Sequence, residues 1–303
     1  MRPSPCFRPV VLTRVRGRAR SVDGGPAVDV AVVLTRVRGR ARTLATAVSV
    51  VLLVAACARR PAITARTLPV ATPASGAALL ETMRARYDGR WYRTLTFVQR
   101  TLLVDPRDGS ERRQTWYEAM AVPGRLRIDL DSTLRTGRLF ANDSQYVIIN
   151  GAVRRAVAGH NPLLVLGFDV YGQPAARTAA VLTTLGFPAG PVRADTWQGR
   201  PVWVVGGAPG DLRSPQYWVD QERLVFVRLI QPDPANPAQA FDARFEQYRP
   251  LGGGWIAPRV EAYTGGRRTL LEEYEDVRAD VELDPALFDA RKWTQARHWV
   301  RGR

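Results

Sequence analysis

The octapeptide PGRLRIDL at residues 123–130 decides the expected fold class. Its Pro–Gly pair marks a turn, and the six residues that follow have the pattern of a strand. Leu126, Ile128 and Leu130 alternate with charged side chains, which places apolar groups on one face and charges on the other. A strand of this kind predicts an antiparallel sheet with one face covered and one face in water.

Similar strand-like segments lie on both sides of this octapeptide along the chain. They occupy residues 91–104, 114–122, 138–159, 192–207, 215–230, 240–249, 254–264 and 268–280. Two other regions, residues 77–87 and 161–185, have apolar residues at helical spacing. This grouping predicts one α+β domain built on an antiparallel sheet.

Two helical regions are few for a sheet of this size, which needs one face covered. The expected architecture is therefore a strongly curved antiparallel β-sheet covered by helices over an apolar cavity. Ordinary core packing is the alternative for each residue expected to line that cavity. The candidate lining residues are Leu95, Phe97, Leu126, Ile128, Trp203, Phe226 and Phe245.

Residue types that carry bond chemistry are sparse in this sequence. Only His160 and His298 are present, which are too few for a histidine-based metal site, and no serine lies in a nucleophile elbow. We therefore expect no enzyme activity, no cofactor and no metal. One acidic cluster is expected to be a solvated strand edge rather than an acid–base pair or a Ca²⁺ site: Glu272, Glu273, Glu275 and Asp276.

The stretch VVLLVAACARR at residues 50–60 has the pattern of a processing signal. Arginines precede an uncharged run at residues 44–56, which is too short to cross a hydrocarbon layer of ~30 Å as a helix and fits the apolar part of a secretory signal. The sequence Val-Ala-Ala-Cys that ends at Cys57 resembles the bacterial lipobox. This resemblance implies cleavage before Cys57 and a lipid anchor on its thiol. The alternative is a buried free cysteine after a core helix.

The peptide VVLTRVRGRAR occurs twice, at residues 10–20 and 32–42. Because repeat architectures need more copies, we interpret residues 1–31 as a spurious extension ahead of the signal peptide, with a functional basic arm as the alternative. The expected organisation has four parts: extension plus signal peptide over residues 1–56, a flexible tether over 57–76, the domain over 77–290 and a basic C-terminal tail over 291–303.

The net charge of +16 at first suggests a nucleic-acid partner. Half of this charge lies in residues 1–56, which contain ten Arg and two Asp. In the rest of the chain the arginines are scattered among acidic residues rather than clustered. We therefore expect no nucleic-acid binding.

Four short motifs resemble the LolA/LolB superfamily of outer membrane lipoprotein carriers. They are Phe-x-Gln at residues 97–99, PGRLRIDL itself, the hairpin at residues 143–157 and VELDPALF at residues 281–288. The resemblance implies a half-open barrel with helices as a lid, and a cavity that binds acyl chains without bond chemistry. It also places Arg127 at the family's arginine, where it would bond the lid and set its opening. A solvated strand arginine is the alternative.

Together these inferences predict a membrane-anchored lipoprotein that binds lipid or the acyl chains of lipoproteins and acts in their transfer to the outer membrane. Its partners would be the membrane, through the N-terminal lipid, a lipid or acylated lipoprotein as cargo, and a periplasmic carrier protein. It would lie in the bacterial cell envelope, at the periplasmic face of the outer membrane. The alternative is an envelope sensor or assembly lipoprotein that uses the same fold to bind a protein partner.

Overall fold

The computed structural model describes residues 71–302, and the structural statements below concern these residues. The predictions for Cys57, for residues 1–56 and for most of the tether lie outside the described residues. Fifteen strands are present: β1 (Thr94–Val104), β2 (Glu111–Ala121), β3 (Arg125–Asp129), β4 (Gly137–Ala141), β5 (Ser144–Ile149), β6 (Ala152–Ala158), β7 (Val192–Trp197), β8 (Arg200–Gly206), β9 (Gln216–Asp220), β10 (Phe226–Pro232), β11 (Ala240–Glu246), β12 (Arg249–Leu251), β13 (Gly254–Ile256), β14 (Arg259–Thr264) and β15 (Arg267–Ala279).

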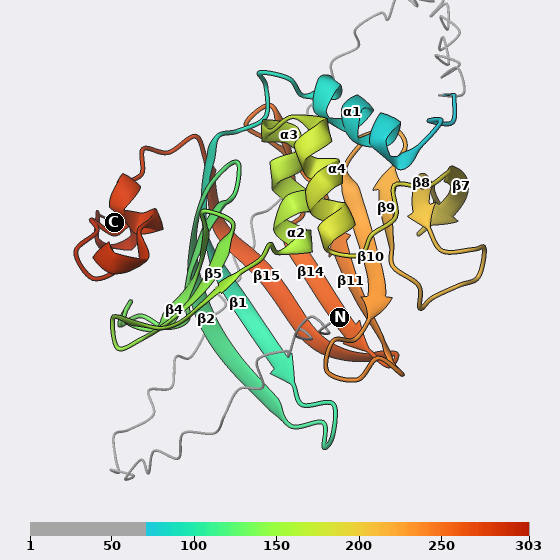
Figure 1. Ribbon diagram of the computed structural model, residues 1–303. Helices are drawn as coiled ribbons and strands as arrows, with labels where there is room; N and C mark the ends of the chain where they lie inside the picture. Colours follow the sequence, from blue (N-terminus) through green and yellow to red (C-terminus); the bar gives the residue numbers. More distant parts are fainter. Residues whose placement is uncertain (1–70, 303) are drawn as a thin grey trace, which may run out of the picture. The chain divides into compact units, whose positions relative to one another are not determined.

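Thirteen of these strands form one antiparallel sheet (Figure 1), in the order β6-β5-β4-β3-β2-β1-β15-β14-β11-β10-β9-β8-β7. The short strands β12 and β13 pair with each other. The sheet consists of two halves in which neighbouring strands follow one another along the chain, except that the β12–β13 hairpin lies between β11 and β14 in the sequence. Strand β1 pairs with β15 from Leu95 opposite Ala279 to Leu103 opposite Leu270, and this pairing joins the two halves.

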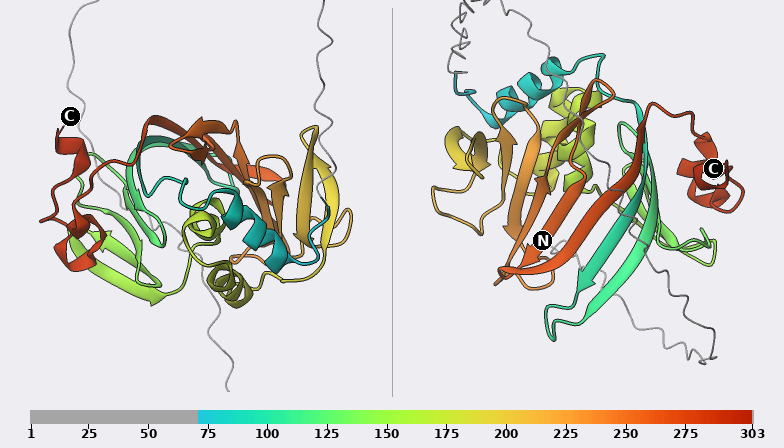
Figure 2. Two further views of the ribbon diagram at one scale, coloured as in Figure 1. Left: turned by 90° about the horizontal axis from the view of Figure 1, so that it is seen from above. Right: turned by 180° about the vertical axis from the view of Figure 1, so that it is seen from behind.

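The helices lie in the segment before β1 and in the connection between the two halves. They are α1 (Gly76–Arg86), α2 (Pro162–Leu164), the π-helical turn η1 (Val165–Asp169), α3 (Val170–Gly172) and α4 (Ala175–Thr184). The side chains of Ser75 and Asn161 cap the starts of α1 and α2 by accepting backbone N–H groups. All four helices lie against one face of the sheet, here the helix-side face, and the other is the outer face (Figures 1 and 2).

The C-terminal segment packs on the outer face through three 3₁₀ turns, η2 (Pro285–Phe288), η3 (Ala290–Lys292) and η4 (Trp299–Gly302). Trp293 is 1% exposed and forms a second apolar core with residues of β2, β4 and β5. The prediction of a basic tail over residues 291–303 is thus corrected, because Trp293 anchors this segment to the sheet. No helix among residues 71–302 is long and apolar enough to cross a membrane.

The predicted antiparallel sheet with few helices is confirmed, and residues 268–280 form a strand as expected. The predicted strongly curved half-barrel is not confirmed, because the sheet is open, with β6 and β7 at its two ends. The alternation that defined residues 125–130 is present in β3. Leu126 packs in the helix-side core, whereas Arg127 lies beneath the C-terminal segment on the outer face.

Gly137 of β4 provides a test of the outer-face packing. A Cβ at this position would lie 2.1 Å from the carbonyl oxygen of Ile128 and 2.7 Å from the Trp293 ring. We expect G137A to lower the free energy of unfolding by about 1–3 kcal/mol, because this contact leaves no space for a methyl group. Urea denaturation measures the change. Gly190 has an ordinary φ and no neighbour within 4 Å of such a Cβ, so G190A is the matched control. Equal stabilities of the two variants would contradict the close packing.

Candidate functional site

The seven predicted lining residues lie on the helix-side face of the sheet. Six of them belong to one buried apolar cluster, and Ile128 packs against it. The helices contribute to the same cluster, since the ring of Phe168 in η1 lies 6.4 Å from that of Phe245, which is 5.0 Å from Phe226. Gly167 lets η1 approach this pair closely, because a Cβ there would lie 3.1 Å from the Phe245 ring. The structure therefore brings the predicted residues together under the helices.

These side chains are packed against the helices as a core. Two cavities found among the described residues are lined by none of these seven residues. One, of about 440 Å³, lies over β1, β2 and β15 and includes Arg100 and Arg113. The other, of about 420 Å³, lies where the helices meet the β2–β3 and β4–β5 turns.

The second cavity is polar and borders the helical layer. Its charged or titratable side chains are Arg125, Asp143, His160, Asp169 and Arg177. Arg177 of α4 donates a 2.6 Å hydrogen bond to Asp143 in the β4–β5 turn. This ion pair is half exposed and therefore contributes little to stability.

Asp169 at the end of η1 ties the helical layer to the β2–β3 turn. Its carboxylate is 3% exposed and accepts a 2.7 Å hydrogen bond from the backbone N–H of Gly124. Burial raises the pKa of Asp169 to about 7, although this hydrogen bond and the charge of Arg177 act in the opposite direction. Nearby, a Cβ on Gly172 would lie 2.6 Å from Val122, so the end of α3 also lies close to this turn.

Arg127 does not bond the helical layer, as its predicted lid-gating role would require. Its guanidinium donates to both carboxylate oxygens of Asp129, at 2.8 and 2.9 Å, and to the carbonyl of Trp293 at 3.1 Å. It also stacks 3.6 Å from the Trp293 ring, while His298 contacts Asp129 at 2.9 Å. The physical reason is strand parity, since Leu126 and Ile128 face the helices and Arg127 faces away. The side chain is 1% exposed, so it is not a solvated arginine either.

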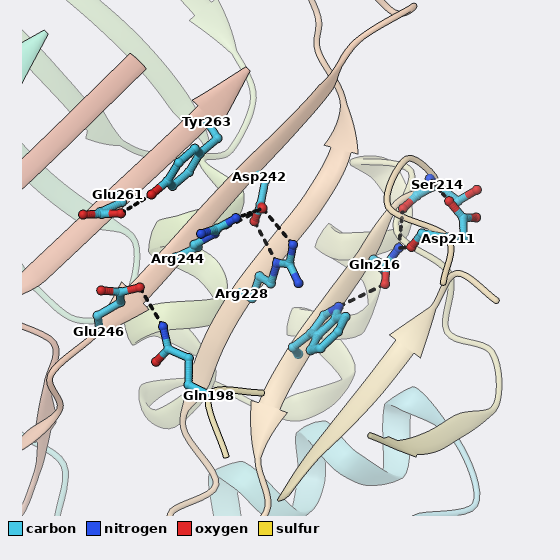
Figure 3. Close-up of polar contacts among 11 residues, drawn as sticks. Gln198, Asp211, Ser214, Gln216, Arg228, Asp242, Arg244, Glu246, Glu261 and Tyr263 are labelled. Carbon is cyan, nitrogen blue, oxygen red and sulfur yellow. Dashed lines mark hydrogen bonds and ion pairs between the residues drawn. The ribbon is translucent and has the colours of Figure 1, made fainter. Parts of the chain in front are cut away.

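A second charged array on the outer face spans β7–β11 and β14 (Figure 3). Arg228 donates two 2.8 Å hydrogen bonds to Asp242, which also accepts from Arg244. The Arg228 guanidinium lies 4.2 Å from the Trp197 ring and 4.9 Å from that of Trp218. The guanidinium groups of Arg228 and Arg244 share the Asp242 carboxylate, and these contacts within the sheet identify the array as structural. No group of three or more potential metal ligands is found within residues 71–302.

The acidic cluster of β15 is divided between two environments. Glu273, Glu275 and Asp276 are exposed, as predicted. Glu272 differs, because its side chain points to the helix-side face, where it accepts a 2.9 Å hydrogen bond from the hydroxyl of Tyr274. Burial raises the pKa of Glu272 to about 7. The solvated-edge prediction is thus wrong for Glu272.

Glu272 belongs to a polar group that the sequence analysis missed. We define the acidic patch as Gln99, Glu118, Glu272 and Tyr274 on strands β1, β2 and β15. Glu118 lies opposite Phe97, which is one of the predicted lining residues, so the patch adjoins the apolar cluster. The sequence did contain a sign of this environment. Glu118 is two residues from Met120 on the same strand, so both side chains lie on the face that is buried in the apolar cluster.

Comparison with known proteins gives structural likenesses alone. No protein-family model and no curated protein matches the sequence. A DUF1329 family protein from Desulfovibrio piger is 12% identical, with a TM-score of 0.46 over 71% of this chain and 95% of that chain. A LolA superfamily protein from Nitrosomonas europaea is 11% identical, with a TM-score of 0.46 over 69% of this chain and 96% of that chain.

A putative outer membrane lipoprotein-sorting protein domain from Vibrio parahaemolyticus is 13% identical, with a TM-score of 0.45 over 72% of this chain and 97% of that chain. The sequence motifs resemble the LolA/LolB superfamily. Two of the structures to which this chain is similar are named for a LolA superfamily protein and for a lipoprotein-sorting domain.

Replacement of Asp169 by Asn should change how stability depends on pH. The folded chain holds the proton of Asp169 up to about pH 7, whereas the unfolded chain releases it near the usual pKa of 3.8. This group therefore stabilises the fold below pH 4 and loses that contribution as the pH rises to about 7. D169N keeps an acceptor for Gly124, so its stability relative to wild type should increase across this window. Urea titrations from pH 4 to 8 measure the difference, with the exposed D88N as control; a difference that is constant with pH would disprove the assignment.

Removal of Arg127 should be far more destabilising than removal of a surface arginine. R127M removes the arginine from the buried Asp129 and leaves His298 as its remaining side-chain partner, which we expect to cost about 3–5 kcal/mol of unfolding free energy. R100M breaks the half-exposed pair of Arg100 with Glu275 and should cost below about 1 kcal/mol. Thermal and urea unfolding compare the two. Similar small losses for both variants would show that the Arg127 pair is not a structural anchor.

Proposed function

We propose that this protein binds the acyl chains of a lipid or of a lipoprotein between its helices and the helix-side face of the sheet. The observation that carries the proposal is the convergence of apolar side chains on this one face. They come from both halves of the sheet and from α1, η1, α3 and α4. Burial of each methylene contributes ~0.8 kcal/mol, so an apolar surface of this kind binds acyl chains without bond chemistry.

The helical layer is suited to be displaced by such a ligand. Its segments contain between three and eleven residues, so they depend on packing rather than on their own hydrogen bonds. Polar ties to the sheet are few; examples are Asp169 to Gly124 and the Tyr171 hydroxyl to the carbonyl of Leu224, at 3.2 Å. An acyl chain that enters beneath the helices replaces one apolar contact by another.

Trp203 provides a further reason to favour an acylated ligand. Its indole nitrogen is buried, and no acceptor for it is found in the described part of the chain. A buried donor without a partner costs about 1–3 kcal/mol. The ester or amide carbonyl at the head of an acyl chain could accept this hydrogen bond.

A lipid anchor on Cys57 would hold this domain at a membrane of the cell envelope, and we propose the periplasmic face of the outer membrane as its location. Two or more acyl chains give stable attachment, so the anchored protein would not leave the bilayer. We therefore propose that it acts as an acceptor in lipoprotein or lipid transfer to the outer membrane, receiving cargo from a periplasmic carrier protein.

An envelope sensor or assembly protein that binds a protein partner is the second candidate. Strand β6 lies at one end of the sheet, and every residue of it is exposed. Val153 is 40% exposed and Val157 is 38% exposed. An open edge with apolar side chains can pair with an extended segment of another protein. Binding at β6 would not require the helices to move.

A disulfide between the helices and the sheet tests the acyl-chain proposal. Val122 and Gly172 are close enough for V122C/G172C to form one, in a C6S/C57S background. We expect the oxidised variant to lose binding of a fluorescent fatty acid and to recover it on reduction. V122C and G172C alone are the controls.

Native mass spectrometry of the C57S protein from a bacterial envelope gives an independent measurement. Co-purified lipid or acylated peptide is the expected result. Empty protein that also fails to bind the fatty acid in the reduced state would refute the proposal. Binding of a partner protein that is equal in the oxidised and reduced states would favour the β6 edge.

A further inference from the structure

Glu118 of the acidic patch differs from most buried carboxylates among residues 71–302; Asp169 also has no ion-pair partner, but it accepts a hydrogen bond from Gly124. Asp129, Asp220 and Asp242 each form an ion pair with an arginine, at 2.6–2.8 Å. Glu118 is 5% exposed, yet its carboxylate has no hydrogen-bond or ion-pair partner within residues 71–302. Glu272 has neutral partners, Tyr274 and Gln99. The patch therefore contains two carboxylates and no cation.

This arrangement is costly in an apolar setting. A buried carboxylate without a cation or hydrogen-bond donors is destabilised by several kcal/mol unless it takes up a proton. Burial and the neighbouring charge of Glu272 raise the pKa of Glu118 well above its ordinary value. Asp129, on the outer face, raises it further. The whole chain contains 44 Lys and Arg residues, so composition does not explain why this pair lacks a cation.

Aromatic rings border the same patch. The rings of Phe97 and Tyr274 stack with their centroids 4.2 Å apart. Gln99 lies between Tyr274 on β15 and Trp116 on β2 in the register of the sheet. Aromatic faces attract cations, and they do so most strongly for groups that are poorly hydrated, such as substituted ammonium ions. Carboxylates beside aromatic rings therefore fit an ammonium group.

The patch also lies in line with the apolar cluster. Strand β1 carries Leu95 and Phe97 under the helices and then Gln99 and Thr101 on the same face. Strands β1, β2 and β15 extend beyond the helices (Figure 1). With a rise of ~3.3 Å per residue, Phe97 and Thr101 are roughly 13 Å apart along the strand. A ligand with an apolar part and a cationic end could contact both regions.

We propose that the acidic patch binds the ammonium group of an amphiphile whose acyl chains lie under the helices, with the unpaired Glu118 as its anionic partner and Glu272 as a neighbouring negative charge. This inference rests on the proposed acyl-chain binding and specifies the charge of the ligand. The ligand class is an amine-bearing lipid or acylated amine. Glu118 would gain the cationic partner that the described residues do not supply.

Three amphiphiles with the same chain length provide the test: dodecyltrimethylammonium, dodecyl maltoside and dodecyl sulfate. Isothermal titration calorimetry is carried out on the full chain with C57S, below the concentrations at which these compounds form micelles. We expect dodecyltrimethylammonium to bind about tenfold more tightly than the neutral maltoside. E118Q/E272Q should abolish this preference while leaving maltoside affinity unchanged.

E275Q is the matched control, because Glu275 lies on β15 but is half exposed and pairs with Arg100. It should retain the preference for the cation. Urea denaturation checks that E118Q/E272Q is folded, and removal of the unpaired carboxylate of Glu118 should leave it at least as stable as wild type at pH 8.

The outcomes distinguish the ammonium site from the acyl-chain binding on which it rests. Equal binding of the cationic and neutral compounds, or a preference that survives in E118Q/E272Q, would overturn the ammonium site and leave acyl-chain binding intact. Failure of all three compounds to bind the wild-type protein would instead overturn the proposed function. A loss of maltoside binding in E118Q/E272Q would also count against the ammonium site, because the substitutions would then have disturbed the apolar region.

Discussion

The pairing of β1 with β15 is the interaction on which the rest of this structure depends. These strands lie near opposite ends of the domain, and their ladder runs from Leu95 and Ala279 to Leu103 and Leu270. Closure of so long a loop has an entropic cost that grows slowly with its length, so long strands with many registered pairs can offset it. Because this ladder joins the two halves, it determines which side chains from each half share a face. The helices between the halves then cover that shared face.

Charge is distributed unequally between the two faces that result. On the outer face, Arg127 and Arg228 are each fixed between a carboxylate and an indole ring. Such pairs satisfy their hydrogen bonds and allow arginines to be buried in a sheet. On the helix-side face, the carboxylates of the acidic patch have no such partner among the described residues. Among the described residues, buried arginines of the outer face are thus paired with carboxylates, whereas the patch carboxylates have no arginine partner and Arg138 of β4 lies on their face across Ile128. This contrast separates structural charges from candidate binding groups.

The alternation of apolar and polar residues was sufficient to assign the side chains of several strands to one face of the sheet or the other. The alternation around Leu126 and Ile128 correctly predicted the covered face, and all seven candidate lining residues gather there. Strand parity could not identify the partner of Arg127, because Trp293 reaches it from more than 160 residues away. The C-terminal segment is rich in polar residues, so the sequence analysis did not identify Trp293 as a buried anchor. Likewise, the environment of Glu272 follows from its register with Thr101 on β1, which is a long-range contact that the sequence pattern does not contain.

The free energies at the helical layer favour the replacement of helix–sheet contacts by contacts with an acyl chain, and they disfavour exposure of the apolar core to water. Each neutral hydrogen bond between this layer and the sheet, such as Tyr171 to Leu224, contributes about 1 kcal/mol net. A chain of about twelve methylenes gains roughly 10 kcal/mol on burial before the entropic costs of binding. A ligand can therefore offset the loss of several such ties, provided that the displaced helices keep an apolar surface to pack against. The same balance holds the layer closed without ligand, because opening would then expose the rings of Phe168 and Phe245 to water.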